Sequence, residues 1–409
     1  MSDLPPSFDP LSAAFAQDPY PAYADLRTQP GPVRFDDFDI WLVSRFEDVN
    51  RVIQDKTMVR ASDAFMSDED RAAQQRAENF HDMPNHERFV QFSLLDSDGP
   101  VHDRLRKLVF REFTKTHLAG QRGMIETFVT GLVDEVADKG TIDFIGEFAA
   151  HIPGHVIGRV IGVPDEDCPQ LRQWSEDTVS YFDIDRTDAK KAKAEQAVTD
   201  FYHYLLDLIK LRRAEPDGGI LTSLIGALGR GDLSEDELIS TCMLILMAGH
   251  GSTIDVLGSG MHALLRHPDQ MQRLRDDRGL MPTAIQEMFR YESPLPFFHR
   301  YATEDCEVAG KTFHRGDRIG VLYGAANRDP AAFDQPETFD VGRSPNRHLA
   351  FGGGAHFCLG NQLARIDMEV VFGQLFDRFS RIELAEEAPI YKTGLSVRGP
   401  KALKVTFSN

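Results

Sequence analysis

The chain has few cysteines and no cysteine cluster. Among its 409 residues there are four, Cys168, Cys242, Cys306 and Cys358. No two of them have the CxxC spacing of zinc or dithiol sites. We therefore expect no disulfide, and a pattern of this kind suits a reducing compartment.

The chain also lacks an excess of positive charge and a targeting segment. Its 45 Lys and Arg against 64 Asp and Glu give a formal net charge of −19, which argues against binding to nucleic acid or to an anionic membrane. The first residues, MSDLPPSFDP, have neither a basic nor an apolar run, and no later stretch approaches the roughly 18 to 20 apolar residues of a membrane span. We expect a soluble, cytoplasmic and monomeric protein.

No linker, charge block or internal repeat divides the sequence. The simplest organisation is one large domain, residues 19–409, after an N-terminal extension of residues 1–18. With 42% hydrophobic and 27% charged residues, the composition is that of a globular protein long enough to bury a core and enclose a cofactor.

Hydrophobic periodicity predicts a mainly α protein with a small β region. Amphipathic segments indicate helices at 20–29, 46–55, 101–113, 123–138 and 194–214, and short apolar pieces indicate strands at 33–35, 40–43, 306–308, 318–322 and 403–407. The longest helix is expected from Ser234 to Arg266, where Ser234 and Glu237 form a capping box. At 1.5 Å per residue it would span about 50 Å. Two glycines in its middle, in AGHGST (248–253), each cost roughly 1 kcal/mol, so a close contact or tight helix packing is expected there.

The glycine-rich segment FGGGAHFCLG, residues 351–360, places Cys358 where a loop turns into a helix. Glycines let the backbone approach a bulky planar group. A helix N-terminus favours the thiolate form of cysteine. Cys358 is therefore a candidate metal-bound thiolate; the alternative is a free cysteine beside a flexible turn.

This segment resembles the haem-binding signature of the cytochromes P450, FxxGxHxCxG, at Phe351, Gly354, His356, Cys358 and Gly360. The resemblance implies a triangular prism of helices with a long central distal helix, holding haem b (iron protoporphyrin IX) through Cys358. A thiolate ligand pushes electron density toward bound oxygen and favours O–O cleavage.

A second segment, IQEMFRYESP, resembles the ExxR helix of the same family and contains Glu287 and Arg290. Three residues apart on a helix, they lie on one face and can form an ion pair. Such pairs are common on surfaces, so the pair alone is weak evidence. The resemblance adds Arg328, in ANRDP, as the residue joining the pair, with the structural role of locking the cysteine loop.

A third segment, DSDGPVHDRLRKLV (96–109), resembles the helix that covers a haem edge. The resemblance implies that His102, Arg106, Arg300 and His356 bind the haem propionates. Buried carboxylates need such partners to offset desolvation. The alternative for all four residues is an ordinary solvated charge or a satisfied histidine.

The helix of His102 also carries Arg104, Lys107, Arg111 and Lys115, and Arg365 follows the cysteine loop. A basic patch on an acidic protein suits the steering of an acidic ferredoxin or flavodoxin. The alternative is a solvated helix face.

The chain departs from the family on the distal helix, where most relatives carry an acidic residue followed by threonine. Here Gly251 and Ser252 stand at these positions, and Thr253 lies about 100° further around the axis. These three are the catalytic candidates. Serine can still donate and accept hydrogen bonds, whereas glycine can do neither. Ser252 with ordered water, polar groups of the substrate, or the use of peroxide would each account for the difference.

Family position also proposes a substrate pocket: Leu244, Met247, Ala248, Leu295, Phe297, Phe298 and Leu395. The aromatic pair Phe297 and Phe298 suits a compact apolar or aromatic ligand, although both could be core residues. The AGHG run and RGPKALKVTF are similar to segments of aromatic O-demethylating cytochromes P450, which makes a methoxylated or phenolic ring a candidate substrate.

The resemblance thus implies a monooxygenase that inserts one oxygen atom from O2 into a C–H bond of a small organic molecule. Two alternatives stay open. One is a peroxide-driven enzyme of the same family, suggested by Gly251. The other is a haem-thiolate sensor without turnover.

Overall fold

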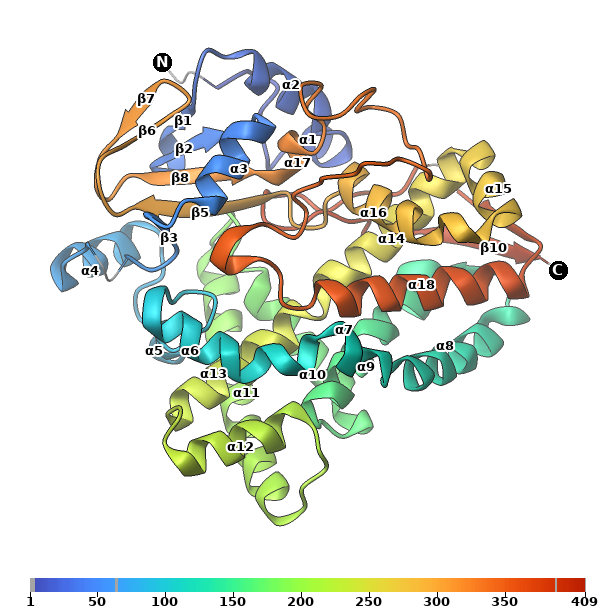
Figure 1. Ribbon diagram of the computed structural model, residues 1–409, viewed down its shortest axis with the longest axis horizontal. Coiled ribbons are helices and arrows are strands. Elements are labelled where there is room, and N and C mark those ends of the chain that lie inside the picture. The colour runs from blue at the N-terminus through green and yellow to red at the C-terminus, as the bar shows by residue number, and fades with distance from the viewer. Residues whose placement is uncertain (1–3, 63–64, 387, 409) are drawn as a thin grey trace. The chain divides into compact units, whose positions relative to one another are not determined.

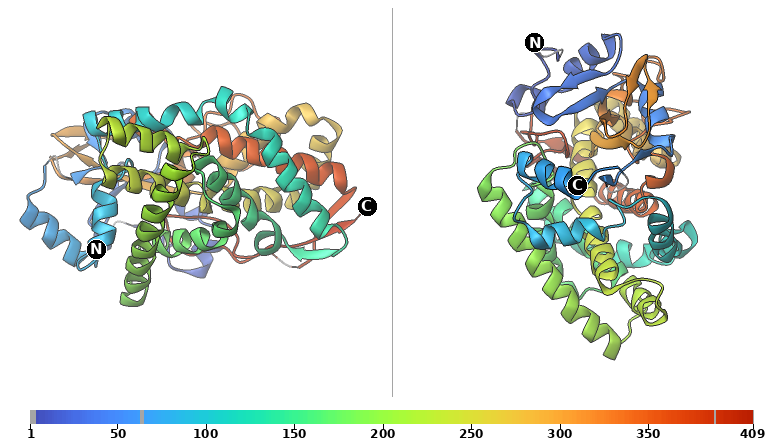
Figure 2. Two further views of the ribbon diagram at one scale, coloured as in Figure 1. Left: turned by 90° about the horizontal axis from the view of Figure 1, so that it is seen from below. Right: turned by 90° about the vertical axis from the view of Figure 1, so that its left-hand side faces the viewer.

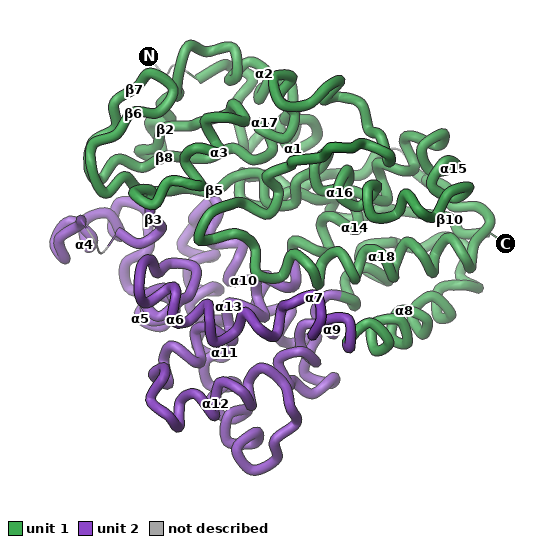
Figure 3. The backbone as a smooth tube through the Cα atoms, viewed as in Figure 1, with its two compact units in different colours: residues 1–58, 121–152, 252–409 green, residues 59–120, 153–251 purple. Residues whose placement is uncertain are grey.

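The computed structural model describes residues 4–62, 65–386 and 388–408. Helices dominate, with three small sheets (Figure 1). The chain forms two compact units (Figure 3): unit 1 contains residues 1–58, 121–152 and 252–409, and unit 2 contains residues 59–120 and 153–251. The single domain 19–409 with its extension 1–18 stays a prediction. Within that N-terminal stretch, Phe8 and Phe15 are buried beside the ring of Tyr23.

Unit 1 contains all three sheets, except that Val59, the last residue of β3, falls in unit 2. The first has the strand order β1-β2-β8-β5-β3. Its strands are β1 (Val33–Phe35), β2 (Ile40–Val43), β8 (Arg318–Leu322), β5 (Phe297–Ala302) and β3 (Met58–Val59). The second sheet has the order β4-β10-β9, from β4 (Thr141–Asp143), β10 (Lys404–Ser408) and β9 (Arg381–Leu384). The third is the hairpin of β6 (Cys306–Val308) and β7 (Lys311–Phe313).

Unit 1 also contains helices. They are α1 (Ala13–Gln17), α2 (Tyr20–Thr28), α3 (Phe46–Gln54), α8 (Arg122–Ala137), α14 (Gly251–Arg266, of which Gly251 falls in unit 2), α15 (Pro268–Asp276), α16 (Met281–Tyr291), α17 (Tyr323–Ala326) and α18 (Asn361–Arg378). Helix α18 packs along α8 and against α16.

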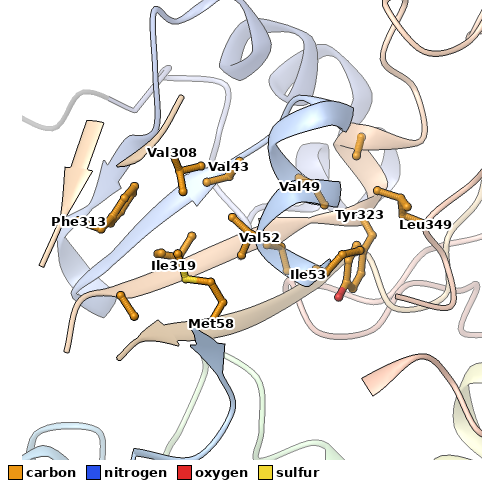
Figure 4. Close-up of a cluster of buried hydrophobic side chains, with 13 residues drawn as sticks. Val43, Val49, Val52, Ile53, Met58, Val308, Phe313, Ile319, Tyr323 and Leu349 are labelled. Atoms are coloured by element: carbon orange, nitrogen blue, oxygen red, sulfur yellow. The ribbon is translucent and has the colours of Figure 1, made fainter. Parts of the chain in front are cut away.

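A hydrophobic cluster joins the first sheet to α3 (Figure 4). Val49, Val52 and Ile53 of α3 pack on Ile319 and Val321 of β8, and all are at most 4% exposed. Burying such side chains stabilises the unit by about 1.5–3 kcal/mol each. The cluster continues to Leu349, so the same core reaches the residues that precede the cysteine loop.

Unit 2 is helical. Its helices are α4 (Asp68–Ala77), α5 (Pro84–Gln91), α6 (Gly99–Phe110), α7 (Lys115–Ala119), α9 (Ile152–Ile161, of which Ile152 falls in unit 1), α10 (Cys168–Val179), α11 (Asp188–Ala214), α12 (Ile220–Arg230) and α13 (Glu235–Ala248). The longest, α11, is seen along its length in green in Figure 2. It packs against α5, α10, α12 and α13. The carboxylate of Glu195 in α11 accepts the backbone N–H groups of Asn85 and His86 at 3.0 Å each, which fixes the start of α5.

Each of the ten elements predicted from the sequence is present. Helix α11 begins at Asp188, earlier than the predicted residue 194, because the Thr187 side chain caps it by accepting the N–H of Lys190. The capping box of Ser234 and Glu237 is confirmed, since each accepts the other's backbone N–H. The run predicted as one long helix is helical from Glu235 to Arg266 except at Gly249 and His250, where it divides into α13 and α14.

By length and composition, the run Glu235–Arg266 meets the criterion for a membrane-spanning helix. The prediction that no stretch approaches this apolarity is therefore wrong. The cause is that buried faces all around a core helix give the same composition as a membrane span. Of its most apolar window, 72% is buried inside the protein, as in the core helix of a soluble protein.

Replacing the helix cap Ser234 by alanine should lower the free energy of unfolding by about 1 kcal/mol, because α13 loses the hydroxyl that accepts the N–H of Glu237. Urea denaturation measures the change. Ser67→Ala is the control: Ser67 caps α4 in the same way, but α4 has no buried residue, so its fraying should contribute little to global unfolding. Equal losses in the two variants would contradict this account.

Candidate functional site

The loop that carries Cys358 requires glycine at position 354. Gly352 and Gly354 have φ values of 66° and 63°, in the left-handed region. A side chain at Gly354 would overlap the backbone carbonyl oxygen of Ile53 in α3. The loop therefore lies directly on α3, and a larger residue would force it away.

Hydrogen bonds fix Cys358 at the entrance of α18. Its N–H donates to the carbonyl of Phe351 at 2.9 Å, and its own carbonyl accepts from the side chain of Asn361 at 2.7 Å. Helix α18 begins directly after Gly360. The partly exposed sulfur thus stands near a helix N-terminus, which favours a thiolate. Phe357, beside it, is 39% exposed, so an apolar surface adjoins the thiol.

A buried cluster of charges lies behind this loop. Glu287 and Arg290 of α16 are both fully buried and form two hydrogen bonds of 2.7 Å. The predicted pair is therefore confirmed. Arg343 donates to both oxygens of Glu287 at 3.1 Å, and the N–H of Asp340 and the side chain of Asn346 complete the shell of this carboxylate.

The prediction that Arg328 joins this pair is wrong. Arg343 occupies that position, whereas Arg328 donates to the carbonyl of Tyr291, pairs with Glu337 and stacks on the rings of Tyr20 and Tyr291. Sequence analysis missed Arg343 because it lies in an irregular segment, where no periodicity relates it to α16. Arg328 still fixes the end of α16, because it donates to the carbonyl of Tyr291.

Hydrogen bonds and a contact between aromatic rings connect this charge cluster to the cysteine loop. Arg290 donates to the carbonyl of Asn327, whose side chain accepts the N–H of Leu349 at 2.7 Å. The ring of Phe289 lies 4.5 Å from that of Phe351. The cysteine loop is therefore held on one side by α3 and on the other by α16 and the segment after α17.

The four predicted propionate ligands are divided between the units. In unit 1, Arg300 lies on β5 with 3% exposure and donates to the carbonyl of His299, while His356 lies in the 3-10 turn Gly354–His356. In unit 2, His102 and Arg106 lie one turn apart on α6, and His102 is 2% exposed. Their common role stays a prediction.

The break between α13 and α14, at Gly249 and His250, has a specific cause. Nδ1 of His250 donates to the carbonyl of Leu246 at 3.0 Å, where a regular helix would place the His250 N–H. The imidazole fills the space above Gly154 of α9, which a side chain there would occupy. At Gly249 a side chain would press on Ile157, also in α9. The glycine at 249 thus serves tight helix packing, as expected.

Gly251 differs from Gly249, since no described atom lies within 4 Å of the position where its Cβ would be. Packing therefore does not demand glycine there. Ser252 is half-buried, and Thr253 is 6% exposed and turned about 100° away. These residues stay catalytic candidates.

Of the predicted pocket residues, Phe297 and Phe298 cannot both line one pocket. They are neighbours on β5, so their side chains point to opposite faces of the sheet. Phe298 packs on the cluster around α3, whereas the ring of Phe297 lies against Gly320 on the other face. On α13, Met247 is buried, but Leu244 is half-buried and Ala248 is exposed, which leaves an apolar surface open. Leu395 is 1% exposed and Leu295 half-buried.

The predicted basic patch on α6 is smaller than the sequence indicates. Arg104 forms an ion pair with Glu237, at 2.6 Å, and donates to the carbonyl of Asp232, while Arg111 pairs with Glu112. These charges are partly neutralised inside unit 2. Lys107 and Lys115 are exposed and have no ion-pair partner among the described residues.

Known proteins resemble this chain over nearly its full length. The sequence model of the family described as "Cytochrome P450" matches residues 176–407. The polyketide biosynthesis cytochrome P450 PksS of Bacillus subtilis is 34% identical over 98% of both chains, and 6-deoxyerythronolide B hydroxylase of Saccharopolyspora erythraea is 34% identical over 96% of this chain and 97% of its own. The solved structure of P450BioI with an acyl carrier protein superposes with a TM-score of 0.89 at 31% identity, covering 97% of this chain and 99% of that one. The predicted mainly helical fold is confirmed.

Arg343→Ala should lower the free energy of unfolding by about 3 kcal/mol or more, because it removes one cation from a buried charge cluster and leaves the Glu287 carboxylate with fewer donors. Denaturant titration followed by circular dichroism measures the loss. Arg381→Ala is the matched control, since Arg381 pairs with Glu383 on the surface and its removal should change stability by less than about 0.5 kcal/mol. A loss in Arg343→Ala no larger than in the control would contradict the assigned role.

Proposed function

Because the chain belongs to the cytochrome P450 family and is a monooxygenase, we propose that it inserts one oxygen atom from O2 into a C–H bond of a small organic substrate. The reaction is hydroxylation, or oxidative O-demethylation when the hydroxylated carbon belongs to a methoxy group and leaves as formaldehyde. The observation that carries the proposal is the loop of Cys358, whose thiol lies at the start of α18 beside an apolar surface.

The residues present fit a haem b group. Cys358 would hold the iron, and the exposed Phe357 beside it offers an apolar surface of the kind that a porphyrin covers. When bound, haem supplies the oxidant, and the protein supplies the thiolate, the positioning and the control of protons. Phe351 and Gly360 shape the loop, and His102, Arg106, Arg300 and His356 would donate to the propionates.

Electrons would come from a ferredoxin or flavodoxin and its reductase. The exposed Lys107 and Lys115 of the α6–α7 region support this part of the proposal, because positive side chains on a protein of net charge −19 attract an acidic partner locally. Arg104 contributes less to such attraction because Glu237 neutralises it.

Ser252 is the residue that would hand protons to the distal side. Its hydroxyl both donates and accepts, and general acid transfer through one water is permitted by geometry. Gly251 leaves room for water, since no described atom lies within 4 Å of its missing Cβ position. Peroxide-driven turnover is the second candidate, and the same glycine is the observation that favours it.

The substrate would be bound by apolar walls that include Leu244, Met247 and Ala248 of α13. The names of relatives point to large apolar molecules: vitamin D3 for an enzyme of Pseudonocardia autotrophica, and epothilone B for a solved structure with a TM-score of 0.90. The likeness to O-demethylating enzymes points instead to a small methoxylated ring. Cytoplasmic location is part of the proposal, in keeping with four cysteines that form no disulfide among the described residues.

A carbon monoxide difference spectrum of the reduced protein tests the proposed cofactor and ligand. The wild type should show the thiolate-type Soret band, and Cys358→Ser should lose it. Cys306→Ser is the control, since Cys306 lies in the hairpin of β6 and should not affect the spectrum. A wild-type spectrum without the thiolate-type band would refute the proposed function.

A spectral-shift titration with methoxyarenes, phenols, fatty acids and steroids tests the substrate class, since displacement of distal water reports binding. We expect methoxyarenes to shift the spectrum and to release formaldehyde on turnover with NADH, a ferredoxin and its reductase. Binding of fatty acids or steroids alone would contradict the small aromatic substrate. Faster turnover with hydrogen peroxide than with NADH and the redox partner would favour the peroxide-driven alternative.

A further inference from the structure

One face of α14 carries polar residues where a buried helix ordinarily carries apolar ones. Ser252, Asp255, Ser259, His262 and Arg266 follow one another at intervals of three or four residues. On an α-helix this spacing places them within an arc of about 80°. Asp255, Ser259 and His262 are 1%, 0% and 5% exposed. We call these five residues the polar stripe.

Burial of this stripe needs an explanation, because buried polar groups are unfavourable unless they are hydrogen-bonded. Ser259 donates its hydroxyl to the carbonyl of Asp255 at 2.7 Å. The carboxylate of Asp255 accepts from Nζ of Lys392 at 2.7 Å, and the side chain of Lys392 is 36% exposed. The charge of Asp255 is thus balanced by a cation that reaches solvent.

Tyr391 connects the next two members of the stripe. Its hydroxyl lies 2.8 Å from Nδ1 of His262, and Tyr391 lines the same cavity as Ser259. Polar groups therefore follow one another from His262, through Tyr391 and Ser259, to Asp255, and the hydroxyl of Ser259 bonds the backbone carbonyl of Asp255 and not its carboxylate. Each of these groups except the carboxylate both donates and accepts.

A cavity of about 540 Å³ in unit 1 lies at the far end of the stripe. Ser259, His262 and Arg266 line it from α14, together with Tyr20 of α2 and Tyr391. Arg266 is exposed, and Nε2 of His262 is buried with no hydrogen-bond partner among the described residues. A cavity of this size and polarity holds several waters, which would satisfy that nitrogen.

We propose that the polar stripe, with Tyr391 and Lys392, is the route by which protons pass from this cavity to Ser252. The inference rests on the proposed function, in which Ser252 serves the distal side. Each turnover there consumes O2, two electrons from the redox partner and two protons, and yields one hydroxylated product and one water. The protons must therefore cross the buried part of α14 or enter elsewhere.

The transfer balances at every step. A water in the cavity gives a proton to Nε2 of His262 while Nδ1 releases its proton to Tyr391, which passes its own proton through a second water of the cavity to Ser259. A water carries the proton from Ser259 to the carboxylate of Asp255. Asp255 and Ser252 lie three residues apart, with Cβ atoms about 5–6 Å from each other, a gap that one water spans. No residue is charged or discharged overall.

Neutral imidazole is the form that this transfer needs. Burial lowers the pKa of His262 to about 4, Glu292 opposes that change, and Arg266, Arg398 and His267 add to it. At neutral pH one ring nitrogen therefore carries a proton and the other accepts one. A histidine kept as a permanent cation would block the passage instead.

Three variants test the route by the fate of electrons: His262→Phe, Ser259→Ala and Asp255→Asn. Each should raise the share of NADH consumption that ends as hydrogen peroxide and enlarge the solvent deuterium effect on product formation. The effect should stay below the roughly 10²-fold loss typical of removing a general acid outright. Ser175→Ala is the matched control, because Ser175 is buried and donates to the carbonyl of Leu171 at the same 2.7 Å but lies on α10.

Nitrogen-15 NMR of histidine-labelled resting protein gives a readout without turnover. His262 should show the tautomer protonated at Nδ1, with the nitrogen-15 shift of Nε2 that is typical of an unprotonated nitrogen accepting a hydrogen bond from water. Tyr391→Phe should abolish the preference for that tautomer. A His262 protonated at Nε2 and without contact to water would overturn the proposal, because no proton could then enter from the cavity.

Different results would refute the proposed function and the proposed proton route. Absence of the thiolate-type spectrum refutes the proposed function and leaves the NMR result standing as a structural fact. A normal spectrum in the three variants, with unchanged peroxide release and an unchanged deuterium effect, refutes only the route. In that case the stripe serves to fasten the C-terminal segment to α14 through Lys392 and Tyr391.

Discussion

The buried Glu287 carboxylate is the group on which the position of the cysteine loop depends. Arg290, Arg343, the N–H of Asp340 and the side chain of Asn346 all donate to it, and it is completely buried. A carboxylate in that setting is tolerated only while its shell is complete, because losing one partner leaves an uncompensated buried charge. The shell therefore binds α16 to the irregular segment that leads to Cys358, and the position of the thiol follows from it.

How much of the fold and of the candidate site could be predicted from the sequence depends on how far apart in the chain the interacting residues are. The loop of Cys358, the pair three residues apart on α16 and the capping box at Ser234 are local in sequence, so residue types and spacing are sufficient. Arg343 is not local: the irregular chain between it and Glu287 has no period to count. Phe297 and Phe298 are local in sequence, yet the prediction for them failed. Two adjacent aromatic residues suggest that both line one pocket, but neighbouring residues of a strand point to opposite faces of the sheet.

Two kinds of buried polar group result, and they differ in how completely they are satisfied. Around Glu287 each carboxylate oxygen accepts from three donors, and Arg290 and Arg343 also donate to backbone carbonyls, which makes the cluster rigid. Along α14, hydroxyl and imidazole groups have both donor and acceptor capacity, and His262, whose buried Nε2 has no hydrogen-bond partner among the described residues, lines a cavity. Saturated charge suits a scaffold, whereas groups with reversible hydrogen bonds suit the movement of protons. The three-four spacing of the stripe is visible in the sequence, but its neighbours Tyr391 and Lys392 come from a segment more than a hundred residues later.

The stripe also bears on the missing acid of the distal helix. Packing does not require glycine at 251, because a Cβ there would meet no described atom within 4 Å. The absence of a carboxylate at that position is therefore not imposed by sterics. Asp255 lies one turn further along the same helix and so on the same face. Gly399 presses so closely on Asp255 that a side chain there would displace the carboxylate, and Lys392 balances its charge. In the proposed route, Asp255 supplies the buried acid one turn later on the same helix, with a connection to solvent through Lys392, and so takes the place of an acid at position 251.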